Sequence, residues 1–209
     1  MKYILMITLV AAFVLAGEFE EGVQAYKKGN YQEATRLWKL SAKQGDNKAQ
    51  NNLAGMYYGG LGVQKDYKEA VRLWKLSAKQ GDKKAQYNLA VLYEGGLGVK
   101  QNYKEALNLY SLSSNQGYLL ATSNLALMYV KGLGIEKNYT EAIRLWELGA
   151  KEGDAGAETN LGIMYYYGYG IQQNKIKAYQ WWLKAAKKSN AEAQKNLDML
   201  CKESPWACS

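Results

Sequence analysis

An internal repeat of 36 residues is the feature that most constrains how this chain can fold. Aromatic, alanine and leucine residues each recur at this spacing along most of the sequence. The aromatic series consists of Trp38, Trp74, Tyr110, Trp146 and Trp182. A period of this length is typical of solenoids, in which each unit buries its apolar side against the next. The sequence therefore predicts five units, at 31–66, 67–102, 103–138, 139–174 and 175–200.

Each unit is expected to contain two helices. In the second unit, Ala70, Leu73 and Trp74 stand at i, i+3 and i+4, the stripe of an amphipathic helix. Asp66 precedes this helix and Glu69 follows three residues later, which predicts a capping box. The glycines expected to end these first helices in a left-handed conformation are Gly45, Gly81, Gly117 and Gly153. The pattern predicts an all-α fold, an α/α superhelix of five stacked antiparallel helix pairs.

A glycine-rich segment recurs between the units, as GGLGV, GGLGV, KGLGI and YGYGI at 59–63, 95–99, 131–135 and 167–171. A glycine-rich turn before a helix can cradle a phosphate. A phosphate loop, however, is normally built once and follows a strand, whereas each of these copies follows a predicted helix. The four copies therefore predict a structural corner. The glycines expected to set its geometry are Gly62, Gly98, Gly134 and Gly170.

The composition excludes several kinds of active site. The chain has no histidine, which removes histidine-dependent triads and imidazole metal ligands. Its 27 basic and 19 acidic residues are scattered without long runs of one sign, so no nucleic-acid partner is expected. No cofactor, metal site or catalytic residue is predicted.

The two ends of the chain suggest export. Residues 1–16 combine Lys2, an apolar run and small residues before a cut after Ala16, the outline of a signal peptide. Residues 17–30 would then form an N-terminal capping helix. Cys201 and Cys208 stand seven residues apart, and in an exported protein they are expected to form a disulfide clasp at 201–209, although two free thiols are the alternative. The expected location is the periplasm or the exterior, with no membrane span after signal cleavage.

The repeat resembles the Sel1-like repeat, a relative of the tetratricopeptide repeat with a longer, glycine-bearing loop. The resemblance is clearest at KAYQWWLKAAKKSNAEAQKNL, residues 177–197, and extends from Tyr31 to about Leu200. It implies a superhelix used as a protein-interaction scaffold, here a monomer. Some cysteine-rich relatives are described as β-lactamases or penicillin-binding proteins, which is the alternative function. The S-x-x-K, S-D-N and K-T-G motifs of such serine enzymes do not occur in this chain.

Two ladders of polar residues are candidates for partner binding. By analogy with related repeats, the first helix of each unit is expected to line a concave groove that suits a protein or an acidic peptide. The candidate groove residues are Arg36, Arg72, Asn108, Arg144, Lys39 and Lys75. The second ladder consists of Asn52, Asn88, Asn124, Asn160 and Asn196. Its amides either satisfy a neighbouring loop or hold a peptide main chain, and the sequence leaves both interpretations open.

Overall fold

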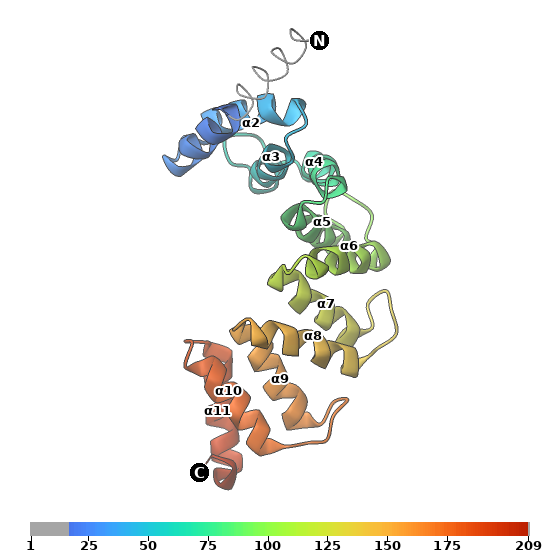
Figure 1. Ribbon diagram of the computed structural model, residues 1–209, viewed down its shortest axis with the longest axis vertical. Coiled ribbons are helices and arrows are strands. Elements are labelled where there is room, and N and C mark those ends of the chain that lie inside the picture. Colours follow the sequence, from blue (N-terminus) through green and yellow to red (C-terminus); the bar gives the residue numbers. More distant parts are fainter. Residues whose placement is uncertain (1–16, 209) are drawn as a thin grey trace, which may run out of the picture. The chain divides into compact units, whose positions relative to one another are not determined.

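The computed structural model describes residues 17–208, which form helices joined by turns and short loops (Figure 1). Residues 17–27 are helical. The later elements are α2 (Tyr31–Lys43), α3 (Asn47–Gly59), α4 (Tyr67–Lys79), α5 (Lys83–Gly95), α6 (Tyr103–Asn115), α7 (Leu119–Lys131), α8 (Tyr139–Lys151), α9 (Ala155–Tyr167), α10 (Lys175–Ala186), α11 (Ala191–Glu203) and the 3-10 turn η1 (Pro205–Ala207). The described range contains no strand, so the predicted all-α class is confirmed. The expected signal peptide, 1–16, lies outside the described residues.

The chain divides into two compact units, which are described separately. Unit 1 runs from Met1 to Ser113 and unit 2 from Ser114 to Ser209. Within unit 1, α3 packs against both α2 and α4, and α4 packs against α5. Within unit 2, α9 packs against both α8 and α10, and α10 packs against α11. Each unit is therefore a stack of antiparallel helix pairs, as the repeat predicts.

The helix starts follow the predicted caps, with one correction. The side chain of Asp66 accepts hydrogen bonds from the backbone N–H groups of Lys68 and Glu69 at 2.9 and 3.0 Å. The predicted return bond from Glu69 to the Asp66 backbone is wrong. That N–H donates to the carbonyl of Tyr57 at 2.9 Å, and the Glu69 carboxylate bonds Arg72 instead. The end of α3 thus supplies, through the Tyr57 carbonyl, the acceptor that the capping box would have taken from Glu69.

The glycine-rich corners close on their own backbone. Gly60 ends α3 in the left-handed conformation and donates to the carbonyl of Met56, as does Leu61 at 3.0 Å. Gly62 has φ +64°, and a β-carbon there would collide with the backbone of Tyr31 at the start of α2. Only glycine lets the corner lie this close to the start of α2. Because these N–H groups serve helix ends, the corner is structural.

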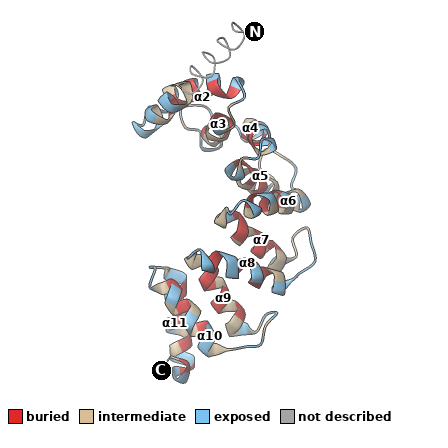
Figure 2. Ribbon diagram, viewed as in Figure 1, coloured by how far each residue is buried: buried red, intermediate tan, exposed pale blue. Residues whose placement is uncertain are grey.

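The aromatic ladder forms the core, and buried residues lie in bands along the helices (Figure 2). Its five members are exposed by 4% or less, and the alanine four residues before each is fully buried. The indole N–H of Trp74 donates to Asn51 at 3.0 Å and that of Trp182 to the Thr159 carbonyl at 3.0 Å. Among the described residues, the buried Trp146 Nε1 has no such partner. Large aromatic side chains bury the most apolar area per residue, so this ladder anchors each helix pair.

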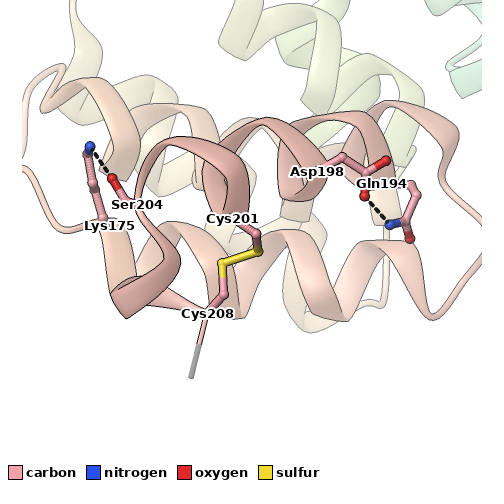
Figure 3. Close-up of a disulfide and its surroundings, with 6 residues drawn as sticks. All are labelled: Lys175, Gln194, Asp198, Cys201, Ser204 and Cys208. Atoms are coloured by element: carbon pink, nitrogen blue, oxygen red, sulfur yellow. Dashed lines mark hydrogen bonds between the residues drawn. A yellow bond between two sulfur atoms is a disulfide. The ribbon is translucent and has the colours of Figure 1, made fainter.

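A disulfide closes the last part of the chain (Figure 3). Cys201 on α11 and Cys208 after η1 are joined with an S–S distance of 2.05 Å. Ser204 and Ala207 between them are each only 3% exposed, and Lys175 of α10 donates to the Ser204 hydroxyl at 2.8 Å. The disulfide therefore fixes η1 against α11 and the start of α10.

Candidate functional site

The predicted groove residues lie on the exposed sides of α2, α4, α6 and α8. Arg36, Arg72, Asn108, Arg144, Lys39 and Lys75 are all exposed. α2 and α4 carry four of them and α6 carries Asn108 in unit 1, while Arg144 lies on α8 in unit 2. We call the exposed side of α2 and α4, and the equivalent side of α8, the arginine face.

Each arginine of this face is held by a glutamate of its own helix. Arg36 binds Glu33 through two parallel hydrogen bonds, Nε to Oε2 at 2.8 Å and Nη2 to Oε1 at 2.7 Å. The same fork joins Arg72 to Glu69 and Arg144 to Glu141. The sequence placed the arginines but missed this pairing. The signal was present as the E-x-x-R spacing, which brings the two side chains together on a helix.

These pairs set the ionisation of the face. The hydrogen bond from Arg36 lowers the pKa of the Glu33 carboxyl, and that from Arg144 lowers the pKa of Glu141. Reciprocally, the hydrogen bond that Arg36 donates to Glu33 raises the pKa of Arg36. The Glu33–Arg36 and Glu141–Arg144 pairs are therefore ionised at neutral pH. The arginine side chains remain more than half exposed, so water competes with each pair and a ligand carboxylate can replace the glutamate.

The two lysines of the ladder lie over tyrosines of the following helix. Lys39 Nζ is 5.6 Å from the ring centre of Tyr57, and Lys75 Nζ is 5.5 Å from that of Tyr93. Cations at this distance from a ring face are attracted by its quadrupole. The ammonium groups are thus positioned beside the helix that follows. Asn108 stands where the arginines stand in the other repeats and offers an amide instead of a charge.

A depression beside the arginine face recurs in both units. In unit 1 it has a volume of about 470 Å³ and is lined by Lys39, Glu69, Arg72 and Leu76 among other residues of α2–α4. In unit 2 a depression of about 580 Å³ shares part of this lining, shifted by 72 residues, including Arg144 and Leu148 but not the counterparts of Lys39 and Glu69. The shift equals two repeats, so both depressions are products of the repeat geometry.

An exposed leucine accompanies the ladder, and sequence reasoning missed it. Leu40, Leu76, Leu112 and Leu148 recur every 36 residues, each four positions after the arginine or Asn108, and are 40–45% exposed. Scattered exposed leucines are unremarkable, but this periodic series places one apolar side chain close to each arginine or Asn108 along its helix. The same 36-residue period that identified the core also identifies these leucines. The arginine face thus combines apolar and charged contacts, which suits a protein surface.

The asparagine ladder lies on the second helices, and all five side chains are half-buried. Asn52 accepts a hydrogen bond from Asn51 at 3.4 Å. The Nδ2 of Asn196 is buried and has no partner in the described part of the chain. Among the described residues of unit 1, neither Asn52 nor Asn88 forms a hydrogen bond to a neighbouring loop. Both side chains instead line a pocket.

Comparison with known proteins decides the family. The sequence model of the Sel1 repeat matches residues 9–46, 47–82, 83–118, 119–154 and 155–190. The chain belongs to the Sel1 repeat family. The Sel1 repeats begin 16 residues later than the predicted units, at 47 where a unit began at 31, so that one repeat pairs α3 with α4. The first matched repeat begins within the stretch expected as a signal peptide.

Solved Sel1 structures share this fold. A Sel1 repeat protein from Oxalobacter formigenes is 32% identical with a TM-score of 0.79, covering 86% of this chain and 74% of its own. The protective antigen c5321 of uropathogenic Escherichia coli is 30% identical with a TM-score of 0.84, covering 90% of this chain. This chain spans only 41% of c5321. A search of the curated proteins found no match.

Residues 17–208 contain no metal-binding cluster of histidine, cysteine or acidic residues and no helix that could span a membrane. Among residues 17–208, no group of three or more histidine, cysteine or acidic residues is placed to hold a metal ion. Over the same residues, no helix has both the length and the apolar character needed to cross a membrane. Sel1 repeats generally mediate contacts between proteins. The arginine face and its depressions are therefore the candidate site for such a contact.

Proposed function

We propose that this Sel1 repeat protein is an exported scaffold that binds a protein or acidic peptide through its arginine face, the predicted concave groove. The observation that carries the proposal is the recurrence of one depression in both units, lined in each by an arginine that pairs with a glutamate of its own helix and by an exposed leucine. A surface repeated at a fixed spacing suits an extended partner that makes the same contact more than once.

The chemistry of the face favours partners that carry carboxylates beside apolar side chains. The guanidinium group of each arginine can donate two parallel hydrogen bonds to a carboxylate. A partner carboxylate would exchange with Glu69 or Glu141, which leaves the arginine paired throughout. The neighbouring leucine, Leu76 or Leu148, would contact an apolar side chain of the partner. Specificity would come from matching both contacts to the repeat spacing.

Export to the periplasm or the exterior is part of the proposal. The Cys201–Cys208 disulfide supports it, because disulfides persist in oxidising compartments. The apolar N-terminal segment fits a signal peptide in the sequence. In that setting we expect a monomer, which light scattering on the purified protein would check.

The β-lactamase alternative has no observation in its favour. The serines that precede an AKQ sequence are Ser41 and Ser77, and both are fully buried. The Ser77 hydroxyl donates to the carbonyl of Asn47 at 2.8 Å, so it is used by the fold. A serine nucleophile must reach a bulky ring substrate, and these two do not reach the surface.

A charge-reversal experiment tests the arginine face. The variant carries Arg36→Glu, Arg72→Glu and Arg144→Glu. The control reverses three lysines that lie on second helices, Lys48→Glu, Lys84→Glu and Lys195→Glu, and so has the same net charge. Tagged proteins are expressed in the source cells and their partners are recovered after cross-linking. We expect the control to retain its partners and the arginine variant to lose them. Equal recovery by the two variants would refute the proposal.

A further inference from the structure

The start of α8 carries an exposed motif that takes no part in the arginine face. Residues 136–140 read EKNYT, in which Asn138 and Thr140 form the N-x-T motif of an N-linked glycan acceptor. Glu136 adds the acidic residue, two positions before the asparagine, that some bacterial oligosaccharyltransferases require. Residues 136–138 precede the helix, and Thr140 lies in its first turn. Because helix ends fray, this position is accessible to a modifying enzyme.

The side-chain groups that such an enzyme must reach are not used by the fold. Glu136, Asn138 and Thr140 are all exposed. Among the described residues, the Glu136 carboxylate forms no ion pair and the Thr140 hydroxyl forms no hydrogen bond. The asparagine makes one side-chain bond, in which its Oδ1 accepts from the N–H of Glu141 at 3.0 Å. Its Nδ2, the atom that would carry a glycan, has no acceptor over the same residues.

The cap of α8 and a glycan use different atoms of this amide. Glycosylation replaces one hydrogen of Nδ2 and leaves Oδ1 as a carbonyl oxygen that accepts hydrogen bonds. The bond from Glu141 to Oδ1 can therefore persist in the modified protein. The backbone of Asn138 is also held in place, because its N–H donates to the carbonyl of Tyr129 at 3.0 Å. The start of the helix thus accommodates the modification without losing its cap.

An earlier repeat has the same cap without the acceptor motif. Asn102, 36 residues before Asn138, is exposed, and its side chain accepts a backbone hydrogen bond at 3.1 Å. Lys100 and Lys104 stand where Asn138 has an acid before it and a threonine after it. Capping therefore needs the asparagine alone and accounts for neither of those two residues. Both are residues that an oligosaccharyltransferase recognises.

The surface beside Asn138 offers aromatic rings to the first sugars. The rings of Tyr139 and Tyr169 stack with centres 5.4 Å apart and planes at 16°, and Tyr167 stacks on Tyr169 at 5.3 Å. We call these three residues the tyrosine stack. Tyr167 and Tyr169 are 54% and 45% exposed, and the other three corners have leucine in place of Tyr169. Aromatic rings pack against the apolar C–H faces of sugars, so a glycan on the adjacent asparagine would cover this exposed patch.

We propose that Asn138 is an N-glycosylation site whose first sugars pack on the tyrosine stack. The sugar donor is an oligosaccharide joined through a diphosphate to a lipid. Asn138 Nδ2 attacks C1 of the first sugar and gives one proton to a base of the transferase. The C1–O bond breaks as the C1–N bond forms, and the lipid diphosphate leaves with the electron pair. Because this transfer takes place outside the cytoplasm, the site rests on the export proposed above.

Mass spectrometry of the protein from its own cells tests the site. Full-length wild type and variants are expressed in the source cells, purified and digested, and the peptide that contains Asn138 is measured. We expect this peptide to carry the mass of a glycan in wild type. Thr140→Val keeps the asparagine cap and should abolish the modification, whereas Thr140→Ser should retain it. Glu136→Gln should also lose it. An unmodified wild-type peptide, or a glycan that persists in Thr140→Val, would overturn the proposal.

Asn102 provides the matched control. Its peptide should be unmodified in wild type, and the double variant Lys100→Glu, Lys104→Thr should turn it into a second acceptor. Tyr169→Leu should lower the thermal midpoint more in the glycosylated protein than in the Thr140→Val background, and equal losses would refute packing on the tyrosine stack. The same digest reads the N-terminus. If it shows cleavage after Ala16 but no glycan, export stands and the glycosylation site alone is refuted.

Discussion

Two glycines in the middle of helices should respond oppositely to the same substitution. Gly55 lies in α3 and Gly162 in α9, and alanine in a helix interior is favoured over glycine by about 1 kcal/mol. A β-carbon at Gly55 meets no atom within 4 Å. One at Gly162 would lie 2.8 Å from Cε2 of Trp182 and would collide with its Nε1 and Cδ1. The environment of the added methyl group therefore decides the sign.

The magnitudes follow from these distances. Gly55→Ala should raise the free energy of unfolding by about 0.5–1 kcal/mol, the helix-propensity gain alone. In Gly162→Ala the same gain is opposed by overpacking of about 1–3 kcal/mol, because Trp182 is 1% exposed and has little room to move. Moving the indole also strains its 3.0 Å bond to Thr159, worth about 1 kcal/mol. We expect a net loss of about 1–2 kcal/mol.

Urea unfolding of the two variants and wild type, followed by circular dichroism and tryptophan fluorescence, measures these changes. The comparison is made between variants within one protein, because stacked repeats need not unfold in a single step. The ladder sharpens the test, since Ala54, Ala90 and Ala126 occupy the positions that correspond to Gly162. If Gly162→Ala is as stable as wild type, Trp182 does not pack on α9 as described and the reasoning is refuted.

Three further predictions concern unit 2. Replacing Cys201 by serine should cost about 2.5 kcal/mol, the loop-entropy value for a closure of this length, and hydrogen exchange should show earlier opening of η1; unchanged protection there would contradict it. A hydrogen bond to Glu203 raises the pKa of Tyr166 to about 12, so its contribution to stability is present below pH 10 and is lost as the pH rises through 12. Carbon-13 tyrosine NMR should show this titration, and Glu203→Gln should lower the value. Ser123→Asn should give Trp146 Nε1 the acceptor that Asn51 gives Trp74 but removes the 3.0 Å bond from Ser123 to Asp154, so the free energy of unfolding should change by less than about 0.5 kcal/mol; a loss above about 1 kcal/mol would count against it.

The fold could be predicted from the sequence because the same cap, glycine and aromatic positions recur in several repeats. The caps, the left-handed glycines and the buried aromatic ladder all rest on interactions within a few residues or at one fixed period. The C′ glycines Gly45, Gly81, Gly117 and Gly153 do have positive φ. Helix α7 begins after Tyr118 without a side-chain cap bond, whereas Asp46 and Asp82 cap α3 and α5.

The candidate sites were less predictable, because they depend on how groups share partners. The capping box failed since one carbonyl, that of Tyr57, occupies the N–H that Glu69 was expected to reach. Because Glu69 does not reach the Asp66 N–H, its carboxylate binds Arg72, and the two side chains form an ion pair without net charge. The pocket lined by Asn52 and Asn88 requires helix 17–27 to lie near α3 and α5, a tertiary relation that no period reveals. Periodicity locates the side chains, and competition for partners determines what they offer a ligand.

One set of hydrogen bonds recurs in both units although the residues that form it differ. In unit 1, Gln80 Nε2 donates to the Gly45 carbonyl at 3.1 Å and to Gln50 Oε1 at 2.9 Å. In unit 2, 108 residues later, Lys188 Nζ donates to the Gly153 carbonyl and to the buried Glu158, each at 2.8 Å.

The geometry of this clasp is kept while a neutral pair becomes a charged one. A buried carboxylate is costly unless it is paired, so the two substitutions must occur together, and Lys184 at 2.9 Å supplies further compensation. A search for identical residues sees only differences at these positions, although the hydrogen bonds coincide. In both places a side-chain donor bonds a glycine carbonyl just after a helix and a side chain of the helix that follows that glycine, and glutamine provides the donor in one case and lysine in the other.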